Sequence, residues 1–154
     1  MSPGAAQPMK QFRLPHGRRV WNAPASGRET RFVYREIFER HCYEKHGVAV
    51  SHGDVIFDVG ANIGLFALSL MEHLRDLRIY CFEPVPSTYA CLKRNLAESR
   101  WRTSHEVTAL EVGLGAADGR SHHRVLPGSA RQLDPALQRE TSRIWRNTGR
   151  RALR

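Results

Sequence analysis

The sequence predicts an α/β protein built on an open parallel β-sheet, and three observations support this fold class. A short apolar run at 55–59 ends in a glycine-rich turn and passes into a helical repeat of leucines. A second apolar run at 79–82 precedes another helical segment, and a third run lies at 107–112. Strands that alternate with helices form parallel sheets, because each helix returns the chain to the start of the next strand.

The chain before the first of these strands is expected to form a separate layer over 12–50. Residues 1–11 contain Pro3, Gly4 and Pro8 and lack the apolar segment of a signal peptide, so we expect them to be disordered. Short apolar groups flank the pair His16-Gly17, which indicates a β-hairpin over 12–21.

An amphipathic helix is predicted over 28–43. Ser26 is a suitable N-cap residue, and Glu29, three positions later, matches the second residue of a capping box. The apolar stripe of this helix repeats at helical spacing and consists of Phe32, Val33, Ile37, Phe38 and Cys42.

The elements after the first strand are read in the same way. The first sheet helix carries the stripe Leu65, Leu68, Leu70 and Leu74. The second opens at Pro86 and is expected to end near Ser99. The third strand is expected over 106–114, and Asp118-Gly119 predicts a turn into a possible return strand at 121–126.

The glycine-rich turn at 60–64 is the first candidate site, because parallel sheets bind ligands at the carboxyl ends of their strands. A dinucleotide loop needs the spacing G-x-G-x-x-G, and a phosphate-binding P-loop needs a lysine after its glycines. This turn reads Gly60-Ala61-Asn62-Ile63-Gly64, with asparagine where a dinucleotide loop has its second glycine. A nucleoside without phosphate therefore fits best, and S-adenosylmethionine (SAM) is the common one.

Two acidic residues lie at strand ends beside this turn. Glu83 ends the second strand, where a carboxylate can accept hydrogen bonds from two ribose hydroxyls. Asp58 precedes the glycine turn and has two interpretations. It holds the amino end of SAM, through a water or through the turn backbone, or it only satisfies amides of the loop.

The motif D-x-G-A-N-x-G at 58–64, with F-E-P-V-P at 82–86 and the later residues Tyr89, Leu92 and Asn95, resembles the FkbM-type SAM-dependent methyltransferases. The resemblance extends over about residues 12–130 and implies a Rossmann-like class I methyltransferase sheet over 51–130. It also implies methyl transfer to a small-molecule or sugar hydroxyl. The cofactor-binding residues that follow from the motifs and the resemblance are Asp58, Gly60, Ala61, Asn62, Gly64, Glu83, Pro84 and Leu114, the last beside the adenine ring.

The family's I-D-V-E-G strand motif is absent after residue 130, so the sheet is expected to be incomplete at the C-terminus. Residues 131–154 are rich in arginine, and we expect a basic, disordered tail, although a short helix from Asp134 to about Arg146 is possible. An uncovered sheet edge would favour self-association. The rival function is therefore a truncated SAM-fold module that binds or interacts without catalysis.

Composition and residue spacing bear on three other properties: nucleic-acid binding, metal binding and cellular location. The formal charge of +9 over 154 residues motivates a third reading, an RNA-binding methyltransferase, but no basic and aromatic stripe supports specific nucleic-acid binding. The three cysteines lack C-x-x-C spacing, and the adjacent pair His122-His123 points to opposite faces of a strand, so no metal site is expected. No run is long enough to span a membrane, and a cytoplasmic protein is expected.

No catalytic residue can be assigned from the sequence. Methyl transfer to a hydroxyl needs alignment of the acceptor, exclusion of water and a general base. His105, His122 and His123 are candidates for that base by residue type only.

Overall fold

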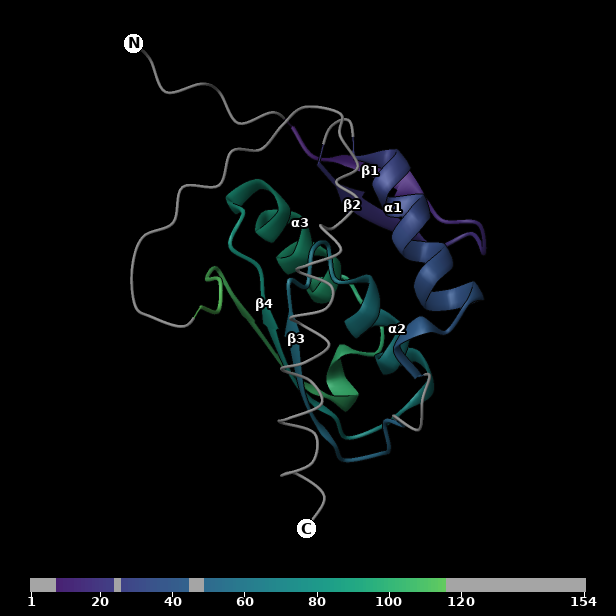
Figure 1. Ribbon diagram of the computed structural model, residues 1–154, viewed down its shortest axis with the longest axis vertical. Helices are drawn as coiled ribbons and strands as arrows, with labels where there is room; N and C mark the ends of the chain where they lie inside the picture. Colours follow the sequence, from purple (N-terminus) through teal and green to yellow (C-terminus); the bar gives the residue numbers. More distant parts are fainter. Residues whose placement is uncertain (1–7, 24–25, 45–48, 116–154) are drawn as a thin grey trace.

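The computed structural model describes residues 8–23, 26–44 and 49–115, and its centre is a three-stranded parallel sheet (Figure 1). The strands β3 (Val55–Val59), β4 (Arg78–Phe82) and β5 (Glu106–Leu110) lie side by side in that order. Residues Val59, Phe82 and Leu110 are aligned across the three strands, so the strand ends share one edge. This arrangement confirms the predicted α/β class and gives part of a Rossmann-like sheet.

Two helices connect these strands and cover one face of the sheet. Helix α2 (Leu65–His73) joins β3 to β4, and helix α3 (Pro86–Ala97) joins β4 to β5. Ile79 and Cys81 of β4 are fully buried in the same apolar cluster as residues of both helices. Both helices lie on one face because successive right-handed crossovers progress in one direction across the sheet.

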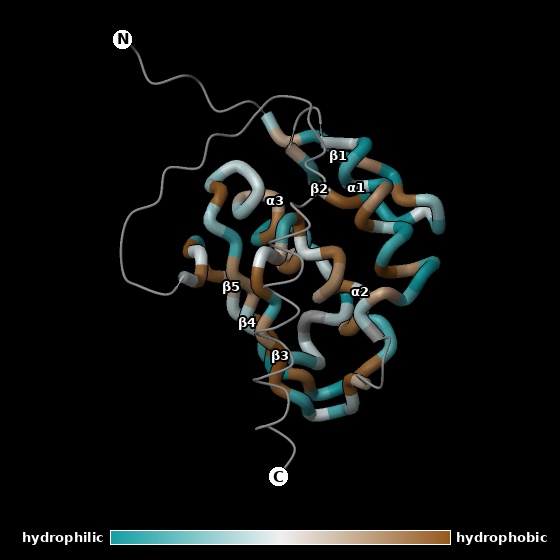
Figure 2. The backbone as a smooth tube through the Cα atoms, in the orientation of Figure 1, coloured by the Kyte–Doolittle hydropathy of each residue, from teal (hydrophilic) through white to brown (hydrophobic). Residues whose placement is uncertain are grey.

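The face of β3 that points away from the two helices is exposed. Val55, Phe57 and Val59 have exposed fractions of 50%, 61% and 57%. The ring of Phe57 stacks against Tyr80 at 5.3 Å and Phe82 at 6.1 Å between centroids. Figure 2 shows that β3 and β4 are largely hydrophobic. Apolar side chains on both faces are typical of a parallel strand that is covered on both sides.

The N-terminal layer begins with the predicted hairpin. Strands β1 (Lys10–Arg13) and β2 (Arg19–Asn22) are antiparallel, and their turn contains Gly17 at a φ of +92°. The expectation that residues 1–11 are disordered is wrong for Lys10 and Gln11, which belong to β1. They are ordered because they pair with Asn22 and Trp21 of β2.

The single helix predicted over 28–43 is wrong. Helix α1 spans Gly27–Tyr34 and continues as a π-helical turn over Arg35–Glu39, where the amide of Arg40 donates to the carbonyl of Arg35. His41 then takes a φ of +48°, which ends the helical path, and a separate 3₁₀ turn forms at Cys42–Glu44.

The predicted apolar stripe of this helix is also displaced. Phe32 is 61% exposed, whereas Thr30, Tyr34 and Ile37 are buried. Thr30 tolerates burial because its hydroxyl accepts from Asn22 Nδ2 at 2.6 Å and donates to the Ser26 carbonyl at 3.0 Å. The interior therefore selects a helix face that includes a satisfied polar residue.

The predicted capping box does not form. Ser26 makes no side-chain cap bond at the start of α1. The Glu29 carboxylate instead accepts a hydrogen bond from Asn62 Nδ2 at 3.1 Å, across 33 residues of sequence. Glu29, the expected capping-box partner of Ser26, thus connects α1 to the glycine turn.

Asn95 of α3 joins the hairpin to the sheet domain. Its Oδ1 accepts from the Trp21 amide at 2.6 Å, and its Nδ2 donates to the Trp21 carbonyl at 3.0 Å and to the Ile63 carbonyl at 2.8 Å. Because Asn95 is buried and both protons of its Nδ2 and its Oδ1 are bonded, it fixes β2, α3 and the glycine turn relative to one another.

The remaining predictions have mixed outcomes. The third strand ends at Leu110 instead of residue 114, since residues 111–115 form no regular element. Within the described ranges no helix is long and apolar enough to cross a membrane. The predicted turn at 118–119, the strand at 121–126, the helix at 134–146, the tail and the pair His122-His123 lie outside the described residues.

Candidate cofactor-binding site

The glycine turn is fixed to the end of β4 by its own backbone. The amides of Gly60 and Ala61 both donate to the carbonyl of Phe82, at 2.9 and 3.0 Å, and the amide of Gly64 donates to the carbonyl of Ala61 at 2.8 Å. Three residues of the turn have positive φ values, Gly60 at +75°, Asn62 at +51° and Gly64 at +88°. Asparagine is among the few residues that adopt this conformation readily, which explains its place in the turn.

The two glycines of the turn serve different purposes. A Cβ atom at Gly60 would meet no atom within 4 Å, so open space lies beside this backbone. A Cβ atom at Gly64 would lie 2.8 Å from Leu92 Cδ1. Gly64 is therefore required for close packing of the turn against α3, whereas Gly60 leaves room for a ligand.

Glu83 accepts hydrogen bonds from the backbone on both sides of the site. Its Oε2 accepts from the Asn62 amide at 3.0 Å, and its Oε1 accepts from the Val85 amide at 2.9 Å. A carboxylate oxygen has two acceptor positions, so each oxygen retains one for another donor. Glu83 is buried and held by two bonds, which places the remaining acceptor positions at the end of β4.

Asp58 lies at the end of β3 with an unsatisfied oxygen. Its side chain is buried, and no described residue donates a hydrogen bond to Oδ2. Burial, with a smaller contribution from the nearby Glu83 charge, raises the pKa of Asp58 to about 7. A buried acceptor without a donor is unusual in a folded protein, and a cationic or hydrogen-bonding ligand would satisfy it.

Pro84 and Leu114 lie at the outer side of this arrangement. A Cβ atom at Gly113 would be 3.4 Å from Pro84 Cβ, so the chain beyond β5 passes directly beside Pro84. Leu114 is 56% exposed. The structure brings Asp58, the glycine turn, Glu83 and Pro84 together, with the segment that carries Leu114 next to Pro84.

The chain is 44% identical over 93 residues to the 31-O-demethyl-FK506 methyltransferase FkbM of Streptomyces tacrolimicus, a match that covers 60% of this chain and 35% of that protein. The matched part of the chain is thus similar to the FkbM-type methyltransferases. Methyltransferase sdnD of Sordaria araneosa is 40% identical over 91 residues, covering 59% of this chain and 34% of sdnD.

The chain spans about a third of the length of these two methyltransferases. It is also 35% identical over 115 residues to the AMB antimetabolite synthetase AmbE of Pseudomonas aeruginosa, which covers 75% of this chain and 5% of AmbE. No family model matches the chain. A crystal structure of Methanocaldococcus jannaschii Trm5 in complex with adenosine aligns with a TM-score of 0.39 and 18% identity, covering 67% of this chain and 30% of Trm5.

Two residues beside the FkbM-type turn were missed by sequence reasoning. Glu29 contacts Asn62 from α1, as described above. Tyr43 stacks on Phe66 of α2 with 4.8 Å between ring centroids, and partial burial and the charge of Asp58 raise its pKa. The sequence carries no signal for either approach, because both depend on how the N-terminal layer folds back over the sheet domain.

His105 does not join this FkbM-type site as a general base. Its Nδ1 accepts from the Leu77 amide at 3.3 Å, and its Nε2 lies 3.3 Å from the Met71 carbonyl. With Nδ1 accepting, Nε2 carries the proton and donates. Both ring nitrogens are thus engaged with backbone groups. No cluster of three or more metal-ligating side chains occurs among the described residues.

Proposed function

We propose that this chain binds SAM at the glycine turn and takes part in methyl transfer to an oxygen of a small molecule. The observation that carries the proposal is the unsatisfied, buried Oδ2 of Asp58 beside the open backbone of Gly60. A carboxylate in this position suits the ammonium group of a methionine moiety, because a buried charge is stabilised by an opposite one.

The other residues of the site fit the remaining parts of SAM. The free acceptor positions of Glu83 suit two ribose hydroxyls, and Pro84 and Leu114 offer apolar surface for the adenine ring. Ala61 and Asn62 contribute backbone at the centre of the turn. When bound, SAM supplies a methyl group that is already activated, so the protein's contribution is to bind it, align the acceptor and exclude water.

The acceptor class rests on the relatives. The name of the Streptomyces tacrolimicus enzyme describes methylation of an O-demethylated compound, which supports an oxygen acceptor. We infer a small-molecule or sugar hydroxyl for this chain as well, and a cytoplasmic location. No general base is assigned, since the nitrogens of His105 are engaged elsewhere.

Calorimetric titration of the full chain with SAM, S-adenosylhomocysteine and NAD tests the binding proposal. We expect SAM to bind in a one-to-one complex and NAD to bind at least tenfold more weakly, because Asn62 occupies the position where a pyrophosphate loop has glycine. Equal or tighter binding of NAD would overturn the assignment. Asp58→Asn is the matched variant, because it keeps the shape of the side chain and removes the charge.

The rival function is a SAM-fold module without catalysis. Both hypotheses predict SAM binding, but only the enzyme transfers the methyl group. Transfer of a radiolabelled methyl group to a panel of hydroxylated small molecules therefore distinguishes the enzyme from the module. SAM binding without transfer to any acceptor favours the rival. The RNA-binding reading predicts RNA affinity that survives about 0.2 M salt, whereas contacts due only to the net charge weaken steeply.

A further inference from the structure

A cavity lies apart from the candidate cofactor residues, between the hairpin, α2 and α3. Its volume is about 450 Å³, and its walls come from the hairpin turn, from α2 and from the end of α3. None of the candidate cofactor residues lines it. Its lining includes His16, Arg18, Arg19, Glu72, Arg100 and Trp101.

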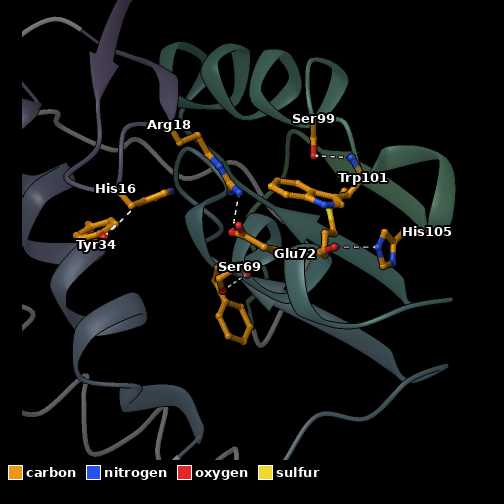
Figure 3. Close-up of polar contacts among 10 residues, drawn as sticks. His16, Arg18, Tyr34, Ser69, Glu72, Ser99, Trp101 and His105 are labelled. Carbon is orange, nitrogen blue, oxygen red and sulfur yellow. Dashed lines mark hydrogen bonds and ion pairs between the residues drawn. The ribbon is translucent and has the colours of Figure 1, made fainter.

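Arg18 is held in a fixed position in the wall of this cavity. Its Nη2 donates to Glu72 Oε2 at 2.6 Å, and its guanidinium carbon lies 4.3 Å from the centre of the Trp101 ring (Figure 3). Only 15% of the side chain is exposed. Nη1 is buried, and no described residue accepts a hydrogen bond from it. Leaving a donor of a charged group unsatisfied is unfavourable, so an acceptor is expected nearby.

The cavity carries excess positive charge. Glu72 compensates Arg18, and Glu98 is bound by Arg94 at 2.9 Å and by the Trp21 indole at 2.8 Å. Arg19 and Arg100 form no ion pair with a carboxylate in the described part of the chain. Partial burial and the charge of Arg18 lower the pKa of His16, so His16 adds little charge at neutral pH.

Arg100 is oriented by the same indole. Its guanidinium carbon lies 4.4 Å from the centre of the Trp101 ring, so one tryptophan positions two arginines. Stacking on an aromatic ring orients a guanidinium while its N–H groups stay available to oxygen acceptors. The hydroxyl of Ser99, which also lines the cavity, is a further donor.

We propose that this cavity binds a phosphorylated small molecule, with the phosphate monoester bound by Arg18, Arg19 and Arg100. The two positive charges that no carboxylate of the described residues compensates match a dianion, and arginine is well suited to phosphate oxygens. A volume of about 450 Å³ is larger than a phosphate ion needs and lies in the range of small-molecule sites. The site is separate from the proposed function, because SAM carries no phosphate.

Calorimetric titration of the full chain at about 0.15 M salt tests this site with ribose 5-phosphate, inorganic phosphate and ribose. We expect ribose 5-phosphate to bind in a one-to-one complex, inorganic phosphate more weakly, and ribose not at all. Equal affinity for phosphate and ribose 5-phosphate would confine the site to the anion and overturn the assignment to a phosphorylated small molecule.

Arg100→Gln is the informative variant, and Arg75→Gln is its control. Arg75 is exposed and lies outside the cavity, so both changes remove the same charge. We expect Arg100→Gln to weaken ribose 5-phosphate binding by about tenfold, the effect of one charge-assisted hydrogen bond, and Arg75→Gln to change it less than twofold. Equal losses in the two variants, or no saturable binding, would show that only the net charge acts. SAM titration of Arg100→Gln, expected to match wild type, separates this result from failure of the cofactor site.

Discussion

At the level of single residues, Asp58 couples stability and binding to pH. Its pKa in the folded protein is about 7, above the ordinary value of 3.8, because burial disfavours the charged form. The folded state therefore binds more protons than the unfolded state between these values, and its stability falls as pH rises from about 4 to 7. We expect Asp58→Asn to be more stable than wild type at pH 8 by about 2 to 4 kcal/mol and nearly equal at pH 4. Urea unfolding at the two pH values measures the difference; a constant gap would contradict the assignment.

The same carboxyl predicts the pH dependence of SAM binding. The ammonium group of SAM is attracted to the ionised form, which is a minor fraction at pH 6 and predominates at pH 8. If only that form binds, the apparent affinity increases by about tenfold between these pH values. Calorimetry of wild type across this range should show the increase, and Asp58→Asn should show a weak, pH-independent affinity. An increase that persists in Asp58→Asn would assign the titration to another group.

Glu83 should matter for binding and for the shape of the turn. Glu83→Ala leaves the amides of Asn62 and Val85 without their acceptors and removes the proposed ribose contacts. We expect SAM binding to weaken by about 1.5 to 3 kcal/mol, the scale for hydrogen bonds to a charged group. Glu106→Ala is the control, because its ion pair with Arg78 is largely exposed. An unchanged dissociation constant in a folded Glu83→Ala protein would restrict Glu83 to a structural role.

Sequence reasoning located these two acidic residues because strand ends can be read from apolar runs. It missed the hydrogen bonds from the Asn62 and Val85 amides to Glu83. It also missed that Glu29 and Tyr43 lie beside the glycine turn. Backbone amides have no signature in the sequence, and the approach of α1 to the turn depends on tertiary packing. The structure brings the predicted residues together, while their roles toward SAM remain predictions.

At the level of elements, the junction between the glycine turn and α2 tolerates no side chain at Gly64 without a loss of stability. Gly64→Ala combines an unfavourable positive φ with a 2.8 Å approach to Leu92, whereas Gly53→Ala has a similar φ of +83° and no atom within 4 Å. We expect Gly53→Ala to cost about 1 kcal/mol of unfolding free energy and Gly64→Ala about 2 to 4 kcal/mol. Adding Leu92→Val to Gly64→Ala should recover part of the extra loss. Equal costs for the two single variants would show that the turn moves away from α3 without penalty.

The strands were predicted well and the N-terminal helix was not, for one physical reason. Each strand is a short segment rich in apolar and β-branched or aromatic residues between turns, and this local pattern is enough to identify it. The helix over 28–43 was inferred from a stripe that includes Phe32, but the interior accepts Thr30 because Asn22 hydrogen bonds to it. The π-helical turn after Tyr34 shifts the register further, and no residue pattern in the segment indicates it.

At the level of the whole molecule, the exposed face of β3 should promote self-association of the chain. Phe57 and Phe32 are both 61% exposed, but Phe57 lies in an apolar sheet face and Phe32 on α1. We expect Phe57→Asp to shift the full chain toward monomer in sedimentation equilibrium and Phe32→Asp to leave it unchanged, since contiguous apolar patches drive association. A wild-type chain that is monomeric at all concentrations, with both variants destabilised alike, would contradict this prediction.

The order of the strands also determines the order in which parts of the fold can form during synthesis. Strands β3, β4 and β5 are neighbours in sequence and in space, so each can pair as soon as it leaves the ribosome. The hairpin precedes the sheet in the chain, yet its anchor, Asn95, lies 74 residues beyond Trp21. The hairpin must therefore wait for α3. A nascent chain stalled before residue 95 should expose the hairpin to proteases, while a chain stalled far enough beyond α3 for this helix to have left the ribosome should protect it.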